Sequence, residues 1–225
     1  MKYTFTLLGL VLFINFTSGQ NFRLYPEMEI TSLASNGGEL TLANGDVVTG
    51  ELSLATVQTS SGLQRITSVI VRNEGEDKQK FKPKDISELR INANWSDNST
   101  NDAAIKFYAE AKSDYYIFRT VKDNKGKQRL MQLLNPGFDD NLQVYVDAKA
   151  KDSGFASMLG KDSAKSYYVT KDVNDKAMYL KKSKYKKTFK DVYGDCSTMM
   201  VELGDDKPNW NDFAQHVYSY NEECE

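Results

Sequence analysis

The sequence is poor in histidine, cysteine and proline: its 225 residues include one His, two Cys and four Pro. A zinc cage of Cys and His needs about four ligands, so the lone His and the two Cys exclude one unless subunits share ligands. The chain also has no G-x-G-x-x-G or P-loop motif, which leaves nucleotide binding without support.

Neither sign of charge is in excess. Lys and Arg number 29 and Asp and Glu number 31, which gives a formal net charge of −2. Because nucleic-acid binding usually accompanies a strongly basic chain, this balance predicts no nucleic-acid partner. Hydrophobic residues make up 40% of the chain and charged residues 27%. This composition excludes a disordered chain and a polytopic membrane protein, and the length predicts one large domain or two small ones.

The longest apolar stretch lies near the N-terminus, over residues 5–16. Lys2 precedes it and small residues at 17–19 follow it, which is the pattern of a cleaved signal peptide; the alternative is a buried N-terminal helix. The stretch is shorter than the roughly 20 residues that span hydrocarbon, so we expect no transmembrane span after its removal. We predict a signal peptide over 1–19 and a single exported domain over 20–225, secreted, periplasmic or on the cell surface.

Alternating polar and apolar residues dominate from residue 28 to about 182, with frequent turn residues between the runs. Asn44-Gly45 separates two such runs, which is a strong hairpin pattern. Residues 105–112 alternate most cleanly of all. About nine or ten short strands are expected before residue 183. The pattern predicts a mainly β fold, an antiparallel sandwich or partly open barrel.

The period becomes helical after residue 182 and predicts a C-terminal segment of two to three helices over 183–225. Gly194 and Gly204 are expected to end the first two helices, and Asp195 and Asn209 to cap the second and third. The apolar residues at helical spacing are Tyr185, Phe189, Val192 and Tyr193, then Met199, Met200 and Leu203, then Trp210, Phe213, Val217 and Tyr220.

The two cysteines fall on the apolar faces of these helices. Cys196 lies within roughly 40° of Met200 and Leu203 around its helix axis, and Cys224 lies within roughly 20° of Phe213 around the axis of the last helix. An exported chain meets an oxidising compartment, where paired thiols become a disulfide. We therefore predict a structural Cys196–Cys224 bond.

Several short pieces of the chain form a pattern when taken together: Leu42-Ala43-Asn44-Gly45-Asp46, Gly50-Glu51-Leu52, Phe81-Lys82-Pro83-Lys84-Asp85-Ile86, Phe189, Tyr193-Gly194-Asp195-Cys196 and Tyr220-Asn221 with Cys224. With these pieces the chain resembles a group of secreted proteins common in Bacteroidetes-type bacteria. The likeness covers most of the mature chain, although Ser197 stands where the group is expected to have Pro. The resemblance implies an exported bacterial protein, and it carries no catalytic residues.

His216 is the only imidazole, so any histidine-dependent general base must be this residue. On the last helix it lies beside the apolar stripe, near Tyr220 and Asp212. We interpret it as a partly buried histidine at the edge of a helix, since the predicted disulfide also removes the thiol nucleophiles.

Adjacent carboxylates occur at Asp139-Asp140 and Asp205-Asp206. A carboxylate pair could catalyse glycoside hydrolysis, but neighbours in turns usually cap helices or solvate the chain. Residues 172–175 have an acidic pattern that is reminiscent of a calcium loop, without the Gly and distal Glu of an EF-hand. We expect no catalytic residue, no metal and no cofactor.

Lysines form the densest charge cluster and are a candidate contact for a polyanion. They also fit the solvated face of a helix whose other face holds Tyr185 and Phe189, with their ammonium groups toward the acidic segment 191–225. The candidate residues are Lys181, Lys182, Lys184, Lys186, Lys187 and Lys190.

Paired tyrosines are a second candidate binding feature, because alternation in a strand places one ring of each pair on the outer face. Tyrosine is also simply a good strand former. The candidates for this ligand platform are Tyr115, Tyr116, Tyr167 and Tyr168.

The sparse catalytic inventory favours a non-catalytic envelope or extracellular protein that acts through surface contacts with a protein or glycan. The alternatives are a secreted hydrolase that uses carboxylates of the sheet and a calcium-stabilised adhesion module.

Overall fold

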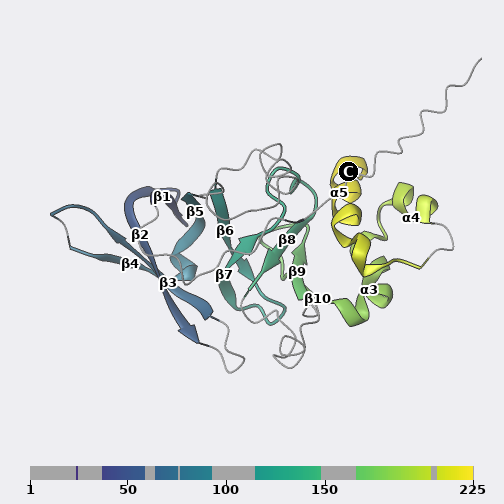
Figure 1. Cartoon of the computed structure of the whole chain (residues 1–225), viewed down its shortest axis with the longest axis horizontal. Helices are drawn as coiled ribbons and strands as arrows, with labels where there is room; N and C mark the ends of the chain where they lie inside the picture. The colour runs from purple at the N-terminus through teal and green to yellow at the C-terminus, as the bar shows by residue number, and fades with distance from the viewer. Residues whose placement is uncertain are drawn as a thin grey trace, which may run out of the picture.

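The computed structural model describes Leu24 and residues 37–58, 64–75, 77–92, 115–147, 166–203 and 207–224. The predicted signal peptide over 1–19, the predicted strand over 105–112 and the pair Asp205-Asp206 lie outside the described residues. The predicted fold class is confirmed, since one open antiparallel sheet is followed by a helical segment (Figure 1).

The strands follow the order β10-β9-β8-β7-β6-β5-β1-β2-β3-β4 within a single ten-stranded sheet. Their bounds are β1 Gly37–Leu42, β2 Val47–Gln58, β3 Gln64–Arg72, β4 Gln79–Phe81, β5 Ile86–Asn92, β6 Tyr115–Lys122, β7 Gln128–Leu133, β8 Gln143–Val146, β9 Ser166–Thr170 and β10 Met178–Lys181. The helices are α3 Tyr185–Tyr193, α4 Ser197–Leu203 and α5 Phe213–Glu223, with short 3₁₀ helices η2 Pro83–Asp85, η4 Lys182–Lys184 and η5 Trp210–Asp212.

The predicted hairpin at Asn44-Gly45 joins β1 to β2. Gly45 has a φ of 92°, a left-handed conformation that glycine adopts without strain. The Asn44 side chain donates to Asp46 Oδ2 over 2.7 Å and closes the turn.

Strands β1–β5, residues 37–92, form a first curl of the sheet. β4 and β5 are joined by residues 82–85 alone, yet they lie at opposite ends of the run β5-β1-β2-β3-β4. In a flat sheet these strands would lie about 19 Å apart, whereas a 3₁₀ connection advances only about 2 Å per residue. The run therefore curls back on itself, and it encloses a mostly aliphatic core of Leu40, Leu52, Ile66, Val69, Val71, Ile86, Leu89, Ile91, Phe118 and Leu130.

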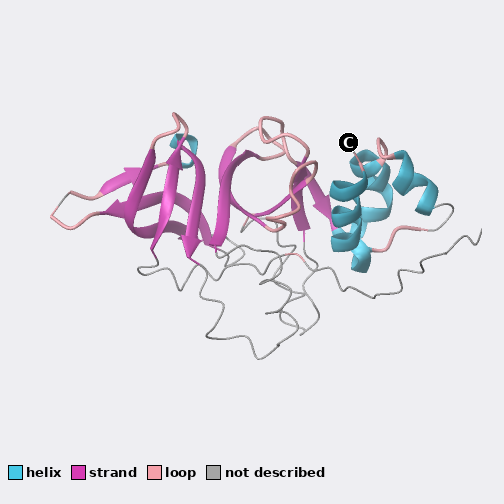
Figure 2. Ribbon diagram, turned by 90° about the horizontal axis from the view of Figure 1, so that it is seen from above, coloured by secondary structure: helices cyan, strands magenta, loops and turns pink. Residues whose placement is uncertain are grey.

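Strands β6–β10, residues 115–181, follow in chain order and form a second curl, visible as the open ring of strands in Figure 2. The N–H of Ala177 donates to the carbonyl of Lys122 over 2.9 Å, so the start of β10 approaches the end of β6. Within the described residues, an isolated bridge between Lys122 and Lys176 takes the place of a strand ladder between these edges, and the ring stays open. Its inner face carries Val121, Met131, Leu133, Tyr145, Tyr168 and Ala177.

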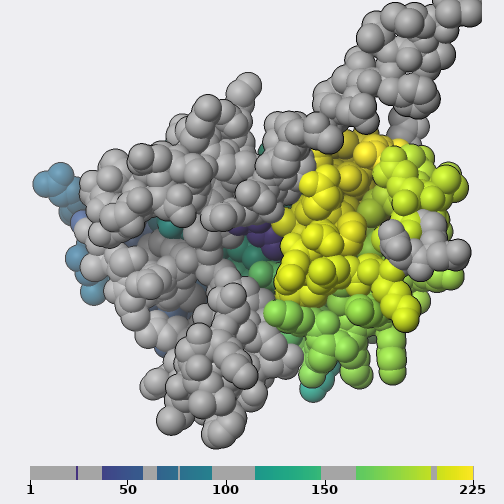
Figure 3. Space-filling model, turned by 45° about the vertical axis from the view of Figure 1, so that its right-hand side comes forward, coloured from purple at the N-terminus to yellow at the C-terminus, as the bar shows by residue number. Residues whose placement is uncertain are grey.

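The helical segment, residues 183–224, packs on the outer face of the second curl. Val144, Val169 and Leu180 from β8–β10 share one apolar core with the buried sides of the helices. α5 lies on the surface of the molecule with α3 beside it (Figure 3).

Candidate binding surface on the helical segment

Helix α3 is strongly amphipathic, and its apolar face fixes which way its lysines point. The ring of Tyr185 lies edge-on against Trp210 and Phe213, with centroids 5.3 and 5.6 Å apart. Because residues three and four apart share a helix face, burying this stripe turns the intervening residues toward solvent. The buried residues of α3 are Tyr185, Phe189, Val192 and Tyr193, as predicted.

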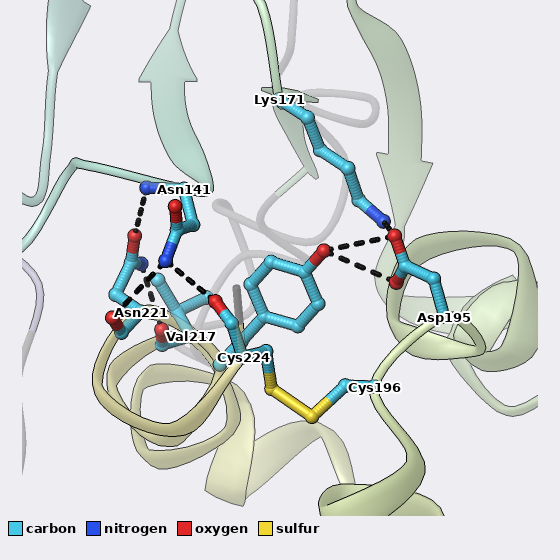
Figure 4. The surroundings of a disulfide bond; sticks show 8 residues. Asn141, Lys171, Asp195, Cys196, Val217, Asn221 and Cys224 are labelled. Atoms are coloured by element: carbon cyan, nitrogen blue, oxygen red, sulfur yellow. Dashed lines mark hydrogen bonds and ion pairs between the residues drawn. A yellow bond between two sulfur atoms is a disulfide. The ribbon is translucent and has the colours of Figure 1, made fainter.

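The predicted disulfide is present. Cys196 and Cys224 are bonded, with Cα atoms 5.4 Å apart, and both residues are buried. The bond joins the residue before α4 to the residue after α5 (Figure 4). It closes residues 196–224, which include α4 and α5, into a covalent loop.

Asn221 ties α5 to the loop between β7 and β8 (Figure 4). Its Oδ1 accepts the backbone N–H groups of Asn141 and Leu142, each over 2.8 Å. Its amide donates to the carbonyls of Leu142 and Val217 over 3.0 and 2.9 Å. The Asn141 side chain in turn donates to the carbonyl of Cys224 over 2.6 Å, beside the disulfide.

A second polar group lies on the other side of the disulfide. Lys171 Nζ donates to Asp195 Oδ2 over 2.5 Å, and the Tyr220 hydroxyl lies 3.1 Å from both carboxylate oxygens. Burial raises the pKa of Asp195, but the bonds from Lys171 and Tyr220 outweigh it, and the pKa falls below its usual value. Burial lowers the pKa of Lys171, but Asp195 and Tyr220 outweigh this effect and raise the pKa above its usual value. The helical segment is thus tied to the end of β9.

Five of the six candidate lysines form what we call the lysine surface: Lys182, Lys184, Lys186, Lys187 and Lys190. All five are exposed, and within the described residues none of their ammonium groups has an ion pair or a side-chain hydrogen bond. The sixth, Lys181, belongs to β10, and its Nζ lies 5.5 Å above the ring of Tyr179. Among the described residues, no acidic residue after 190 forms an ion pair with the lysine surface. The exposed lysines opposite a buried apolar face agree with the solvated helix face that the sequence left as the alternative.

A groove lies between α3 and α4, with a volume of about 510 Å³. Phe189, Met200, Leu203 and Pro208 provide its apolar lining. Lys186 and Lys190, two members of the lysine surface, flank it on the α3 side. Sequence reasoning missed this groove, because the spacing within each helix does not show how two helices pack against each other.

The four candidate tyrosines are not brought together. Tyr115 is 39% exposed and Tyr116 packs against the core of the first curl. Tyr167 stacks on Trp210 and Phe213 beneath the helical segment. Burial raises the pKa of Tyr168, inside the second curl, to about 12. The interpretation of Tyr167 and Tyr168 as a surface platform is wrong, since both rings are buried.

His216 is a partly buried histidine on α5. Its Nδ1 lies 2.7 Å from the Tyr185 hydroxyl, and its ring contacts Phe189 and Tyr193. Burial lowers its pKa below the usual value, although the Asp212 carboxylate opposes this shift. A neutral imidazole held by aromatic rings fits the predicted structural role.

Asp139 and Asp140 have different surroundings. Arg119 Nη1 donates to Asp139 over 2.6 Å and its Nε donates to Glu88 over 2.8 Å, whereas Asp140 is exposed. Burial raises the pKa of Glu88, but Arg119 and Arg90 outweigh it and the pKa falls. Glycoside hydrolysis needs a carboxyl group with a raised pKa as general acid, and Glu88 has the opposite shift.

A buried group of charges in the second curl was not predicted. Asp123 accepts the Nε–H of Arg129 over 2.6 Å and two backbone N–H groups of its own turn. Arg129 Nη1 and Arg65 Nε lie 3.7 and 3.8 Å from Asp147 Oδ2. Burial raises the pKa of Asp123, and its hydrogen bonds outweigh this and lower it. The sequence indication was an Arg next to Leu130 and Met131 in β7.

Residues 172–175 form a tight turn. Asp172 Oδ1 accepts the backbone N–H of Asn174 over 2.8 Å, and Lys122 Nζ donates to the Asn174 carbonyl over 2.8 Å. An ammonium group at this position disfavours a cation there. In the described part of the chain, no three His, Cys, Asp or Glu side chains are grouped so that they could hold a metal ion.

A scan against protein-family models gives no match, and searches of curated proteins and of solved structures give none either. The likeness to secreted Bacteroidetes-type proteins therefore stays a prediction. None of the helices within the described residues is long and apolar enough to cross a membrane.

Proposed function

We propose that this chain is an exported, non-catalytic protein that binds an anionic glycan of the bacterial envelope through its lysine surface. The observation that carries the proposal is the set of five exposed ammonium groups on η4 and α3 without acidic partners among the described residues. The formal net charge of the whole chain is −2, so the attraction is local to this surface.

The chemistry of lysine fits a repeating anion better than a single shaped ligand. An ammonium group is a compact charge on a flexible stem with three donors, and it needs no fixed orientation of its acceptor. Sulfate, phosphate or carboxylate groups along a polymer can therefore pair with several of these lysines at once. Such binding weakens as salt rises, because the charges are exposed.

The ties around α3 favour a binding role. The Asn221 bonds and the Lys171–Asp195–Tyr220 group hold the helical segment on the sheet, and the disulfide cross-links the segment itself. A surface that is already ordered loses less conformational entropy when a partner binds. The disulfide and the apolar N-terminal stretch further support export.

Retention on a heparin-type column tests the proposal. We expect the wild-type protein to be retained at physiological ionic strength, about 0.15 M. A variant with all five lysines of the lysine surface changed to Gln should elute at clearly lower salt. The matched control changes five exposed lysines elsewhere, Lys78, Lys80, Lys82, Lys125 and Lys127, to Gln.

Both variants have the same net charge, so only the position of the lost charges differs between them. Equal loss of retention in the two variants, or no retention of the wild type, would contradict the proposal. If retention depends on the lysine surface but isolated envelope glycans do not compete with heparin, the glycan assignment is wrong.

A further inference from the structure

The groove between α3 and α4 combines an apolar lining with unpaired cations at one side. Phe189, Met200 and Leu203 line the groove. The described lining residues include no Asp or Glu. Lys186 and Lys190 lie one turn apart on the α3 side. A ligand that fills this groove must present hydrocarbon to the lining and an anion to the two ammonium groups.

We propose that the groove binds the acyl chain of an anionic lipid, with Lys186 and Lys190 holding its phosphate or carboxylate head. The inference deepens the proposed function and rests on it in one respect, because it takes the lysine surface as the part of the protein that meets anions. It adds that the envelope component is acylated.

Charge and size both favour this occupant. The groove volume of about 510 Å³ lies within the range of roughly 300–1,000 Å³ that is usual for small-molecule sites. A second copy of the chain would have to place an apolar patch with an acidic group over the groove. A single acyl anion contacts both the apolar lining and the two ammonium groups. Each methylene that leaves water raises affinity by about fourfold.

The direct test is a titration of the wild-type protein with dodecyl phosphate below its micelle concentration, followed by calorimetry or by amide NMR shifts. We expect saturable binding that is about 15-fold tighter than that of decyl phosphate, because two further methylenes are buried. Inorganic phosphate and dodecanol, each at the same concentration, should bind far more weakly. Binding of inorganic phosphate or dodecanol as tight as that of dodecyl phosphate would overturn the assignment.

Matched variants locate the site. Changing Lys186 and Lys190 to Gln should weaken dodecyl phosphate binding about tenfold. Changing Lys182 and Lys187 to Gln removes the same charge from exposed positions that do not line the groove, and should weaken it less than about twofold. Leu203→Glu, at a half-buried position, should abolish binding while the circular-dichroism spectrum is retained. Equal effects of the two double variants would place the ligand elsewhere.

The heparin experiment separates this inference from the proposed function. If heparin retention depends on the lysine surface and dodecyl phosphate does not bind, the acyl site is wrong and the glycan proposal stands. If dodecyl phosphate binds as described and heparin is not retained, the acyl site stands and the glycan proposal is wrong. Dimerisation of the ligand-free protein that Leu203→Glu abolishes would overturn the lipid assignment in favour of a second copy.

Discussion

The first curl and the helical segment are held together in different ways. The core of the first curl is almost entirely aliphatic, with Leu40, Leu52 and Leu89 fully buried. The helical segment relies on stacked rings, a disulfide and side-chain hydrogen bonds to the loops of the sheet. Apolar burial is non-directional, whereas each of these other contacts requires one geometry.

The size of the two regions explains this difference. A segment of roughly 40 residues cannot bury enough apolar surface to fold alone without disulfides, metals or a partner. The helical segment solves this by packing on β8–β10 and by cross-linking itself. Directional contacts also fix the orientation of α3, and so they hold the lysine surface and the groove in place.

Removal of the disulfide should give the largest difference in stability between the helical segment and the first curl. The bond joins residues 28 positions apart, and on the chain-entropy model the change Cys196→Ala with Cys224→Ala lowers the free energy of unfolding by about 3.5 kcal/mol. Hydrogen exchange followed by mass spectrometry should show faster exchange in α3 and α5, with β2 and β3 little changed. Equal acceleration in both regions would mean that the sheet and the helical segment unfold as one unit.

A cavity in the first curl should accelerate hydrogen exchange in the sheet rather than in the helical segment. Leu89 is 0% exposed, so Leu89→Ala should lower the free energy of unfolding by about 3 kcal/mol. Exchange should accelerate in β1–β5, while heparin retention of the folded protein stays unchanged. The control Val47→Ala, at a position that is 56% exposed, should change stability by less than about 0.5 kcal/mol. A loss of retention in Leu89→Ala would show that the two regions are coupled.

The hydrogen bonds of the Asn221 side chain can be tested by a single substitution. Asn221→Ala leaves the N–H groups of Asn141 and Leu142 without their side-chain acceptor, and we expect a loss of about 2 kcal/mol, measured by urea denaturation. Gln215→Ala on the same helix is the control, since within the described residues its side chain makes one 3.3 Å contact with Ser219. Similar effects of the two changes would show that the bonds of Asn221 contribute nothing beyond helix propensity.

Much of this architecture could be predicted because local patterns decide it. The spacing of Tyr185, Phe189 and Val192 specifies the buried face of α3, and Asn44-Gly45 specifies a hairpin. The disulfide could be predicted because helical spacing directs both cysteines toward the apolar residues of the segment and the chain has no other thiols.

The remaining features depend on contacts between distant segments. Alternation indicates that β9 has two faces. It does not indicate that the helices bury one face and that the curl of the sheet buries the other. For this reason the prediction that Tyr167 and Tyr168 lie on the surface was wrong. The ion pair between Arg65 on β3 and Asp147, just after β8, requires segments from both curls to meet. No local pattern encodes that meeting.

The smallest expected effect is the contribution of Asp195 to the pH dependence of stability. Lys171 and Tyr220 lower the pKa of Asp195 against the opposing effect of burial. A carboxylate whose pKa is lower in the folded state binds its proton more readily in the unfolded chain, so its contribution is fully present above the unfolded pKa of about 3.9. It is lost as the pH falls below that value and through the folded pKa.

Thermal denaturation between pH 6 and pH 3 measures this contribution, and Asp195→Asn isolates it. The wild-type melting temperature should fall more steeply below about pH 4 than that of the variant, since the amide keeps hydrogen bonding but has no charge to lose. The difference should shrink at high salt, because the Asp195 and Lys171 side chains are 58% and 38% exposed. Glu88→Gln is the comparison in the first curl, where Arg119 and Arg90 outweigh burial and lower the pKa of Glu88 in the same way. If Asp195→Asn retains the full acid slope while Glu88→Gln loses it, the acid sensitivity belongs to the sheet, and the Lys171–Asp195–Tyr220 group does not hold the helical segment.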